Sequence, residues 1–281
     1  MADTSTSSFM LREAKLRSGE QFAACARAAA DMDITPTFSH STALRYQGVA
    51  VPDDCTLPAG LHISFENRGA RRRFDGTHTH YWSGDFQTTF DEGGGFFVTN
   101  PAMTWAQMAA YVSEESLAVI GGAYACRDEH RRMASLDDLA RYVRDNPYFH
   151  GCRRCKDILP FLLENSDSPP ESAVAVLIMK SGLGTPIANF RIELPAGGYR
   201  LGDLAFPELK LVIEYQGAYH AGLAQMRADA DRWNELRALG WDIVFVTVDD
   251  LRTEHAKRAI VALIRAAMER QKALLGLMKV L

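Results

Sequence analysis

Two carboxylates, Asp203 and Glu214, combine the residue type and the spacing that metal-ion chemistry needs. Residues 199–206 alternate polar and apolar side chains, and residues 210–215 form a largely apolar run that ends in Glu-Tyr. Acidic residues seldom lie inside strands unless they are paired or bind a metal ion. If the two runs are neighbouring strands, both carboxylates reach one edge of a small sheet. The pattern therefore indicates the acidic half of a metal-dependent phosphodiesterase site.

The segments around these carboxylates predict a complete domain. Ser168-Pro-Pro-Glu171 is a strong helix start, because it combines a serine cap, a proline at the first helical position and a glutamate three residues after the cap. That helix continues to Met179. We then predict strands at 187–194, 199–206 and 209–216, a helix at 224–239, a strand at 241–247 and a helix at 250–270. This order predicts an α/β (α+β) fold, with a mixed sheet flanked by helices.

The same segments carry a resemblance to a known group of enzymes. The runs concerned are Glu214-Tyr-Gln-Gly-x-x-His220, then Gln225-x3-Asp229-x2-Arg232-x3-Leu236, then Gly240-Trp241. Together with the order of elements, they resemble the PD-(D/E)XK nuclease superfamily, which has the restriction-endonuclease-like fold. The chain is more closely similar to an actinobacterial family of uncharacterised domains that is related to the very-short-patch-repair endonucleases. The resemblance extends over residues 165–252.

The resemblance implies an endonuclease or nickase, with DNA as the expected partner. It implies that Asp203, Glu214 and the backbone carbonyl of Tyr215 bind Mg²⁺ or Mn²⁺. Such a hard cation takes oxygen ligands, polarises a scissile phosphate and lowers the pKa of a bound water molecule. The expected context is defence or repair.

Gln216 is where the sequence departs from the superfamily, which has lysine at the corresponding position. A lysine ammonium offers positive charge to the transition state, whereas a glutamine amide orients water without supplying charge. The substitution therefore concerns the rate more than metal binding. Two interpretations stay open: a working nuclease tuned around an amide, or a catalytically silent, nuclease-like regulator that binds DNA or a protein partner.

Glu171 and His220 are candidates for assisting roles. Glu171 has the position of a capping-box glutamate, which needs no catalytic function, but the resemblance implies that a glutamate on the first helix also reaches the metal ion through water. His220 follows the strand by four residues, so it is either a solvated loop residue or part of the catalytic set.

Three further polar residues lie on one face of the helix predicted at 224–239. Gln225, Asp229 and Arg232 have the i, i+4, i+7 spacing of a single helical stripe. Asp229 and Arg232 form either an ordinary surface ion pair or a phosphate-binding device in which Asp229 orients Arg232. We favour the second interpretation.

The first part of the chain is a separate domain of mixed α+β type, according to its pattern. The polar, proline-bounded segment 164–170 is the best linker, which divides the chain into domains 1–164 and 165–281. We predict helices at 9–31, 39–46, 101–112, 135–144 and 152–163, and strands at 61–65 and 77–81 on either side of an arginine-rich turn. Residues 38–48 and 98–105 resemble the C-terminal domain of abortive-infection type IV antitoxins, which implies a protein partner in a defence system.

Composition bounds the remaining possibilities. The 31 basic and 35 acidic residues give a net charge of −4, so nucleic-acid binding must rely on local patches. The longest uncharged run, 93–113, contains Asn100, Pro101 and Gln107 and fits no bilayer helix. Five irregularly spaced cysteines favour reduced thiols, and we expect a cytoplasmic protein without membrane association.

Two weaker patterns have ordinary explanations. Cys152-Arg-Arg-Cys155, with Cys126 and His130 as a second pair, suggests zinc, but the second pair lacks the usual spacing. The arginines at 71–73 either contact phosphates or form a solvated hairpin loop.

Overall fold

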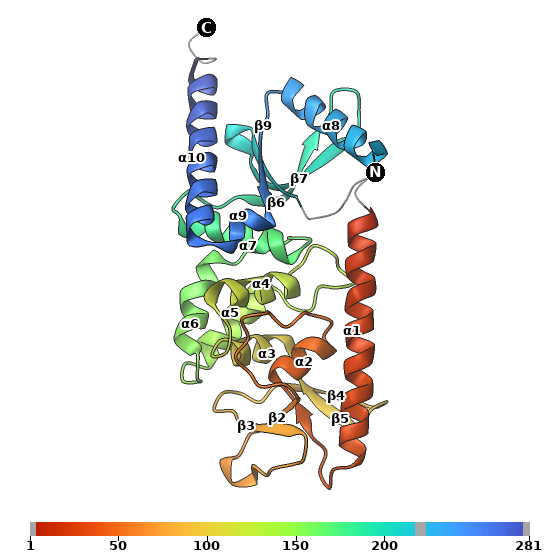
Figure 1. Ribbon diagram of the computed structural model, residues 1–281. Coiled ribbons are helices and arrows are strands. Elements are labelled where there is room, and N and C mark those ends of the chain that lie inside the picture. The colour runs from red at the N-terminus through yellow and green to blue at the C-terminus, as the bar shows by residue number, and fades with distance from the viewer. Residues whose placement is uncertain (1–3, 217–222, 278–281) are drawn as a thin grey trace. The chain divides into compact units, whose positions relative to one another are not determined.

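The computed structural model describes residues 4–216 and 223–277 and divides the chain into two compact units (Figure 1). The first unit ends at Glu164 and the second begins at Asn165. Both units combine helices with a mixed sheet, which confirms the α+β class expected from the sequence. Among the described residues, no helix is both long enough and apolar enough to cross a bilayer.

The first unit contains a five-stranded sheet in the order β3-β2-β1-β5-β4. Its strands are β1 (Thr37–Phe38), β2 (Leu61–Phe65), β3 (Thr77–Tyr81), β4 (Thr88–Asp91) and β5 (Phe96–Thr99). Its helices are α1 (Thr4–Ala30), α2 (His40–Tyr46), α3 (Pro101–Met108), α4 (Glu114–Tyr124), α5 (Leu136–Asp145) and α6 (Cys152–Ile158), with the short 3-10 turns η1 (Arg68–Ala70) and η2 (Leu159–Phe161). Phe38 and Phe96 contact edge to face in the core between α1 and the sheet.

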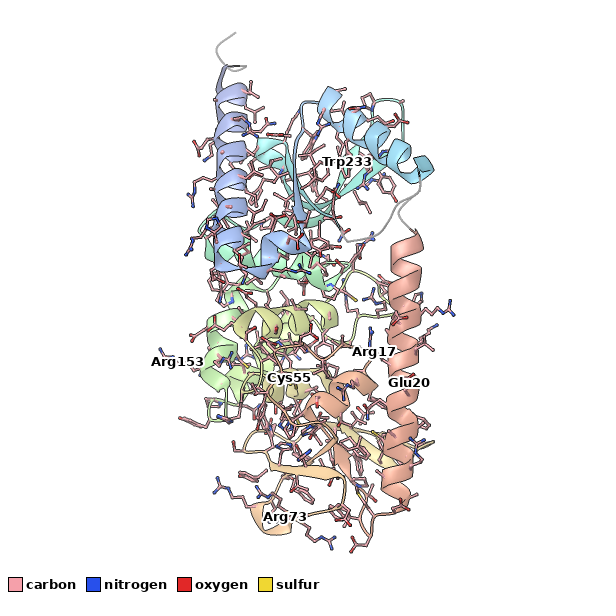
Figure 2. The ribbon with its side chains drawn as sticks, in the orientation of Figure 1. Arg17, Glu20, Cys55, Arg73, Arg153 and Trp233 are labelled. Atoms are coloured by element: carbon pink, nitrogen blue, oxygen red, sulfur yellow. The ribbon has the colours of Figure 1, made fainter. Side chains whose placement is uncertain are left out.

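The connection between β2 and β3 differs from the expected hairpin. The two strands are parallel neighbours, paired from Leu61 with Thr77 to Phe65 with Tyr81. Parallel strands cannot be joined by a tight turn, so residues 66–76 must return along the whole length of the pair. The prediction of a hairpin loop at 71–73 was wrong, because this arginine-rich segment is a crossover connection. Figure 2 labels Arg73 in it.

The second unit contains a four-stranded sheet in the order β6-β7-β8-β9. The elements are α7 (Pro169–Lys180), β6 (Ile187–Glu193), β7 (Tyr199–Phe206), η3 (Pro207–Leu209), β8 (Leu211–Gln216), α8 (Leu223–Ala238), β9 (Asp242–Thr247), α9 (Val248–Arg252) and α10 (Glu254–Leu277). The pairs β6–β7 and β7–β8 are antiparallel, and β8–β9 is parallel. Helices α8 and α10 lie on opposite sides of this sheet (Figure 1).

The expected element order of the second unit is confirmed with one correction. The last helix, predicted as one piece at 250–270, is two helices, because Thr253 is extended between α9 and α10. The Thr247 side chain and Asp250 form a capping box that starts α9 earlier than expected. On the α8 side of the sheet, Val212 and Trp241 pack against Leu236, which fixes the helix over the strands.

Candidate active site

The candidate site lies where strands β7 and β8 separate. Their ladder ends at the pair Leu204–Ile213. Beyond it, β7 continues to pair with β6, and β8 continues to pair with β9. The sheet therefore forks beside Asp203 and Glu214, and backbone groups at the fork need partners other than the neighbouring strand.

Each carboxylate at the fork binds a backbone amide of the opposite strand. The Tyr215 N–H donates to Asp203 Oδ2 at 2.9 Å, and the Asp203 N–H donates to Glu214 Oε1 at 3.3 Å. Directly opposite residues of an antiparallel pair share a face, and this register is set by the pair Leu204–Ile213. The two side chains consequently lie next to each other on one face.

Gln216 shares this face with Glu214, because alternate residues of a strand point the same way. It is the last residue of β8, pairs with Thr247 of β9 and is exposed to solvent. The Tyr215 carbonyl belongs to the residue between them. The β8 end thus presents an exposed amide side chain two positions from a buried carboxylate.

Arg232 of α8 holds the fork from the helix side. Its Nη2 lies 3.4 Å from Glu214 Oε1 and also donates to the Leu201 carbonyl of β7. Its guanidinium stacks over the ring of Trp233, with 4.5 Å between Cζ and the ring centroid. Trp233, labelled in Figure 2, contacts Phe245 edge to face and so fixes this part of α8 on the sheet. Arg232 is therefore held by protein groups, with Glu214 as its ion-pair partner.

Glu171 accepts hydrogen bonds at the start of α7, although the reciprocal capping box expected from the sequence is not formed, since Ser168 makes no side-chain cap hydrogen bond. Glu171 Oε2 accepts the Asp167 N–H at 2.8 Å, and its Oε1 accepts the Ser168 hydroxyl at 2.7 Å, so it satisfies groups at the start of α7. It is also buried, and burial together with the nearby charge of Asp203 raises its pKa to about 8. The helix-capping glutamate is thus electrostatically coupled to the fork.

The three acidic groups resist simultaneous ionisation. Burial and the neighbouring Glu214 raise the pKa of Asp203 well above its usual range. Burial raises the pKa of Glu214 to about 7, although Arg232 partly opposes this shift. A cation placed among them would reverse these shifts, because opposite charge favours the ionised form.

The oxygen donors at the fork are few, but they suit a hard divalent cation. Within residues 4–216 and 223–277, no group of three or more His, Cys, Asp or Glu side chains has the arrangement of a metal site. Two carboxylates and a backbone carbonyl are nevertheless compatible with Mg²⁺, which keeps several water molecules and often takes only one or two protein carboxylates plus substrate phosphate. Asp203, Glu214 and Tyr215 are the residues that could hold it.

Several candidate residues are not placed in this site. His220 lies outside the described residues, as do the side chains of Gln225 and Asp229 on α8. Cys152 and Cys155 of α6 are buried in the first unit, and burial raises the pKa of the Cys155 thiol well above its usual range.

Sequence reasoning missed a cluster of histidines in the first unit. His62 lies on β2, His78 and His80 lie on β3, and His40 begins α2. The His40 and His80 rings stack at 4.0 Å between centroids, beside a cavity of about 660 Å³. The signal in the sequence was Thr77-His-Thr-His-Tyr81, whose alternation places both histidines on one face of a strand.

Comparison with known proteins adds relatives without described activity. No family model matches the chain, and no solved structure matches it. The chain is similar to uncharacterized protein MT2308 of Mycobacterium tuberculosis strain CDC 1551 and to uncharacterized protein Rv2248 of strain H37Rv. Each is 29% identical over 167 residues, which cover 59% of this chain and 60% of the relative. The chain therefore spans about three fifths of the length of these relatives.

Proposed function

We propose that the second unit is a metal-dependent nucleic-acid phosphodiesterase, an endonuclease or nickase that acts on DNA. The observation that carries the proposal is the fork at Asp203 and Glu214, where reciprocal hydrogen bonds hold a half-buried and a buried carboxyl group side by side. Placing two acidic groups side by side away from water costs folding free energy. Proteins that keep such a pair commonly use it to bind a ligand or to do chemistry, so the pair is a functional-site candidate.

In this proposal Asp203, Glu214 and the Tyr215 carbonyl hold Mg²⁺ or Mn²⁺. When bound, the cation supplies Lewis acidity to the phosphate and acidifies a water molecule. Gln216 orients the attacking water with its exposed amide, and Glu171, with a pKa of about 8, is mostly protonated near neutral pH and can donate that proton. Arg232 keeps Glu214 oriented and contributes positive charge near the phosphate.

The second candidate is a silent, nuclease-like regulator that binds DNA or a protein partner in a defence system. The observation that favours it is the ion pair between Arg232 and Glu214, which occupies an oxygen that the cation needs. The absence of a lysine at position 216 points the same way. For either function we infer a cytoplasmic location, because all five cysteines are free thiols.

Nicking of supercoiled plasmid in Mg²⁺ or Mn²⁺ tests the proposal. Wild type should convert supercoiled to open-circular DNA, and Asp203→Ala should not. Asp249→Ala is the matched control, because Asp249 is an exposed carboxylate of the same unit that pairs only with Arg252 in the described structure. Metal-dependent DNA binding by wild type without any cleavage would favour the regulator.

A further inference from the structure

A cavity of about 660 Å³ in the first unit has a positively charged entrance and a neutral polar interior. Its lining includes Arg68, Arg71, His40, His80, Trp82 and Tyr111, and no aspartate or glutamate. A volume of this size suits a small-molecule ligand. Two arginines in a lining without acidic residues favour a ligand with an anionic group.

Arg68 and Arg71 supply the charge at this entrance. Both come from the crossover connection between β2 and β3 and are exposed. Throughout the described ranges, neither has an ion-pair partner, whereas the neighbouring Arg72 pairs with Asp33 at 2.9 Å. Arg68 lies over the Tyr81 ring, with 4.8 Å from Cζ to the centroid. Two uncommitted guanidinium groups beside one cavity fit a phosphate, which they bind through charge-assisted hydrogen bonds.

A ring of hydrogen bonds fixes His40 at the floor of the cavity. The His40 N–H donates to Gln107 Oε1 at 3.2 Å, and Gln107 Nε2 donates to Ser64 Oγ at 3.1 Å. Ser64 Oγ donates to Ser39 Oγ at 2.8 Å, which lies 2.9 Å from His40 Nδ1. Ser39 accepts from Ser64, so its own proton is available to His40 Nδ1, and we assign it to this contact. His40 therefore carries its proton on Nε2, as a hydrogen-bond donor.

The same reasoning assigns the opposite polarity to His80. The Pro58 carbonyl lies 3.1 Å from His62 Nε2 and can only accept, so His62 donates to it. A neutral His62 then accepts at Nδ1 from His80 Nε2, 2.9 Å away. His62 and His80 are neutral because burial lowers each pKa to about 4. The free Nδ1 of His80 is thus an acceptor, next to the donor of His40.

The backbone of His40 has an unusual conformation. Its φ is +53°, in the left-handed region that non-glycine residues rarely adopt. The hydrogen bonds around His40 compensate for that strain. The position of the His40 side chain is therefore maintained at a cost in local backbone energy. Half-buried Tyr81 and Tyr111 add aromatic faces to the cavity wall. Arg68 and Arg71 match a phosphate, and the aromatic faces match a base. The donor of His40 and the acceptor of His80 match a hydroxyl or a ring nitrogen. Together these are the groups of one nucleotide.

We propose that this cavity binds a nucleotide through its phosphate, with Arg68 and Arg71 on the phosphate and the His40–His80 pair on a hydroxyl or ring nitrogen. The nucleotide is either free or the 5′ end of a nucleic-acid strand, since both present the same chemistry. The proposal does not rest on the phosphodiesterase function of the second unit, and no residue of the fork takes part in it.

Titration calorimetry with the full chain tests this inference. The probes are adenosine 5′-monophosphate, adenosine and inorganic phosphate, followed by 5′-phosphorylated and 5′-hydroxyl oligonucleotides of one sequence. We expect the nucleotide to bind roughly a hundredfold more tightly than the nucleoside, because the nucleoside lacks both charge-assisted phosphate contacts, each worth about tenfold. Stronger binding of the phosphorylated oligonucleotide than of the free nucleotide would identify a strand end as the ligand.

Exposed arginines provide matched variants that should not disturb folding. Arg68→Gln with Arg71→Gln should weaken nucleotide binding by roughly a hundredfold, about tenfold for each guanidinium. Arg72→Gln with Arg73→Gln removes the same charge from the same segment outside the cavity, and should leave affinity within about twofold. Asp203→Ala should bind the nucleotide as wild type does, whether or not the wild type cleaves DNA.

Three results would overturn the inference. One is equal binding of nucleotide and nucleoside. Another is equal loss of affinity in the two arginine pairs, which would mean that general positive charge attracts the ligand. The last is the lack of measurable binding for the 5′-monophosphates of all four bases and for both oligonucleotides.

Discussion

The Arg232 guanidinium lies 3.4 Å from Glu214 Oε1 and donates a hydrogen bond to the Leu201 carbonyl of the neighbouring strand. One side chain thus joins α8 to both branches of the fork between β7 and β8. The ion pair also keeps the Glu214 pKa from rising further. In Arg232→Met, we expect the pKa of Glu214 to rise above about 7, so that the carboxyl group is mostly protonated at pH 7 and Mn²⁺ affinity falls roughly several-fold.

That loss should depend on pH. At pH 8.5 the Glu214 carboxyl of Arg232→Met ionises more completely, so much of the Mn²⁺ affinity should return. Calorimetric titrations at the two pH values make the comparison, with Arg252→Met as control, because Arg252 pairs with Asp249 within α9. Equal affinity of wild type and Arg232→Met at pH 7 would contradict the role of this ion pair.

Removal of Asp203 should abolish weak Mn²⁺ binding while the chain stays folded. Sites with two carboxylates and a carbonyl hold such ions loosely without substrate phosphate. The circular dichroism spectrum of Asp203→Ala shows whether this variant is folded. Asp249→Ala is the matched control and should bind Mn²⁺ as wild type does. If Asp203→Ala binds Mn²⁺ with unchanged affinity, the fork is not the metal site.

Gln216 separates the two function classes. In a working nuclease, Gln216→Ala should reduce nicking by roughly 10²-fold, as loss of one preorganised hydrogen-bonding group does. Gln216→Lys should retain or raise activity, because it adds charge at the exposed end of β8. Rates are compared at fixed salt, since phosphate contacts are salt-dependent. Wild-type cleavage that survives Gln216→Ala unchanged would remove this residue from the mechanism.

The two units should respond to pH in opposite directions. In the second unit, the pKa values of Glu171 and Glu214 are raised in the folded state to about 8 and about 7, from 4.5. The unfolded chain releases these protons more readily. The stabilising contribution is therefore complete below pH 4.5 and is lost as pH rises through 7 to 8.

In the first unit the sign is reversed. The pKa values of His62 and His80 are lowered from 6.5 to about 4 by burial, so their contribution is complete above pH 6.5 and is lost as pH falls through 4. Hydrogen exchange read by mass spectrometry follows each unit separately. We expect first-unit amides to lose protection from pH 6.5 to 4, and second-unit amides from pH 5 to 8.5, after correction for intrinsic exchange.

Gly202 tests the packing beside Asp203. A Cβ added there would lie 2.9 Å from Val212 Cγ1 and 3.1 Å from Cγ2. Valine is stiff and buried, so Gly202→Ala should lower the free energy of unfolding by about 1–3 kcal/mol. Urea unfolding measures the loss. Addition of Val212→Ala should recover part of it, and Gly276→Ala, in open space on α10, should be neutral or stabilising.

Local signals in the sequence predicted most of the second unit. The ends of these elements are marked by residues with special backbone chemistry, namely the serine–proline start of α7 and the glycines near 197 and 240. The alternation of the strand around Asp203 correctly predicted which side chains share a face. The split between α9 and α10 was missed, because a five-residue helix leaves little periodicity.

The first unit was predicted less well, for a physical reason. Strand β1 has two residues and β4 and β5 have four each, too short for alternation to show. Its strand order, with β2 parallel to β3, depends on pairings between distant segments. The cavity escaped notice for the same reason, because His40, His80 and Tyr111 come together only through that topology.

The ring formed by Ser39, His40, Ser64 and Gln107 has a consequence for how the first unit assembles. Its bonds span 25, 43 and 67 residues of sequence, so closing it requires α2, β2 and α3 to be in place together. Contacts of such long range form late and open together. Opening at the His40 amide should therefore require cooperative unfolding of the whole unit, which makes this amide a reporter of global rather than local stability.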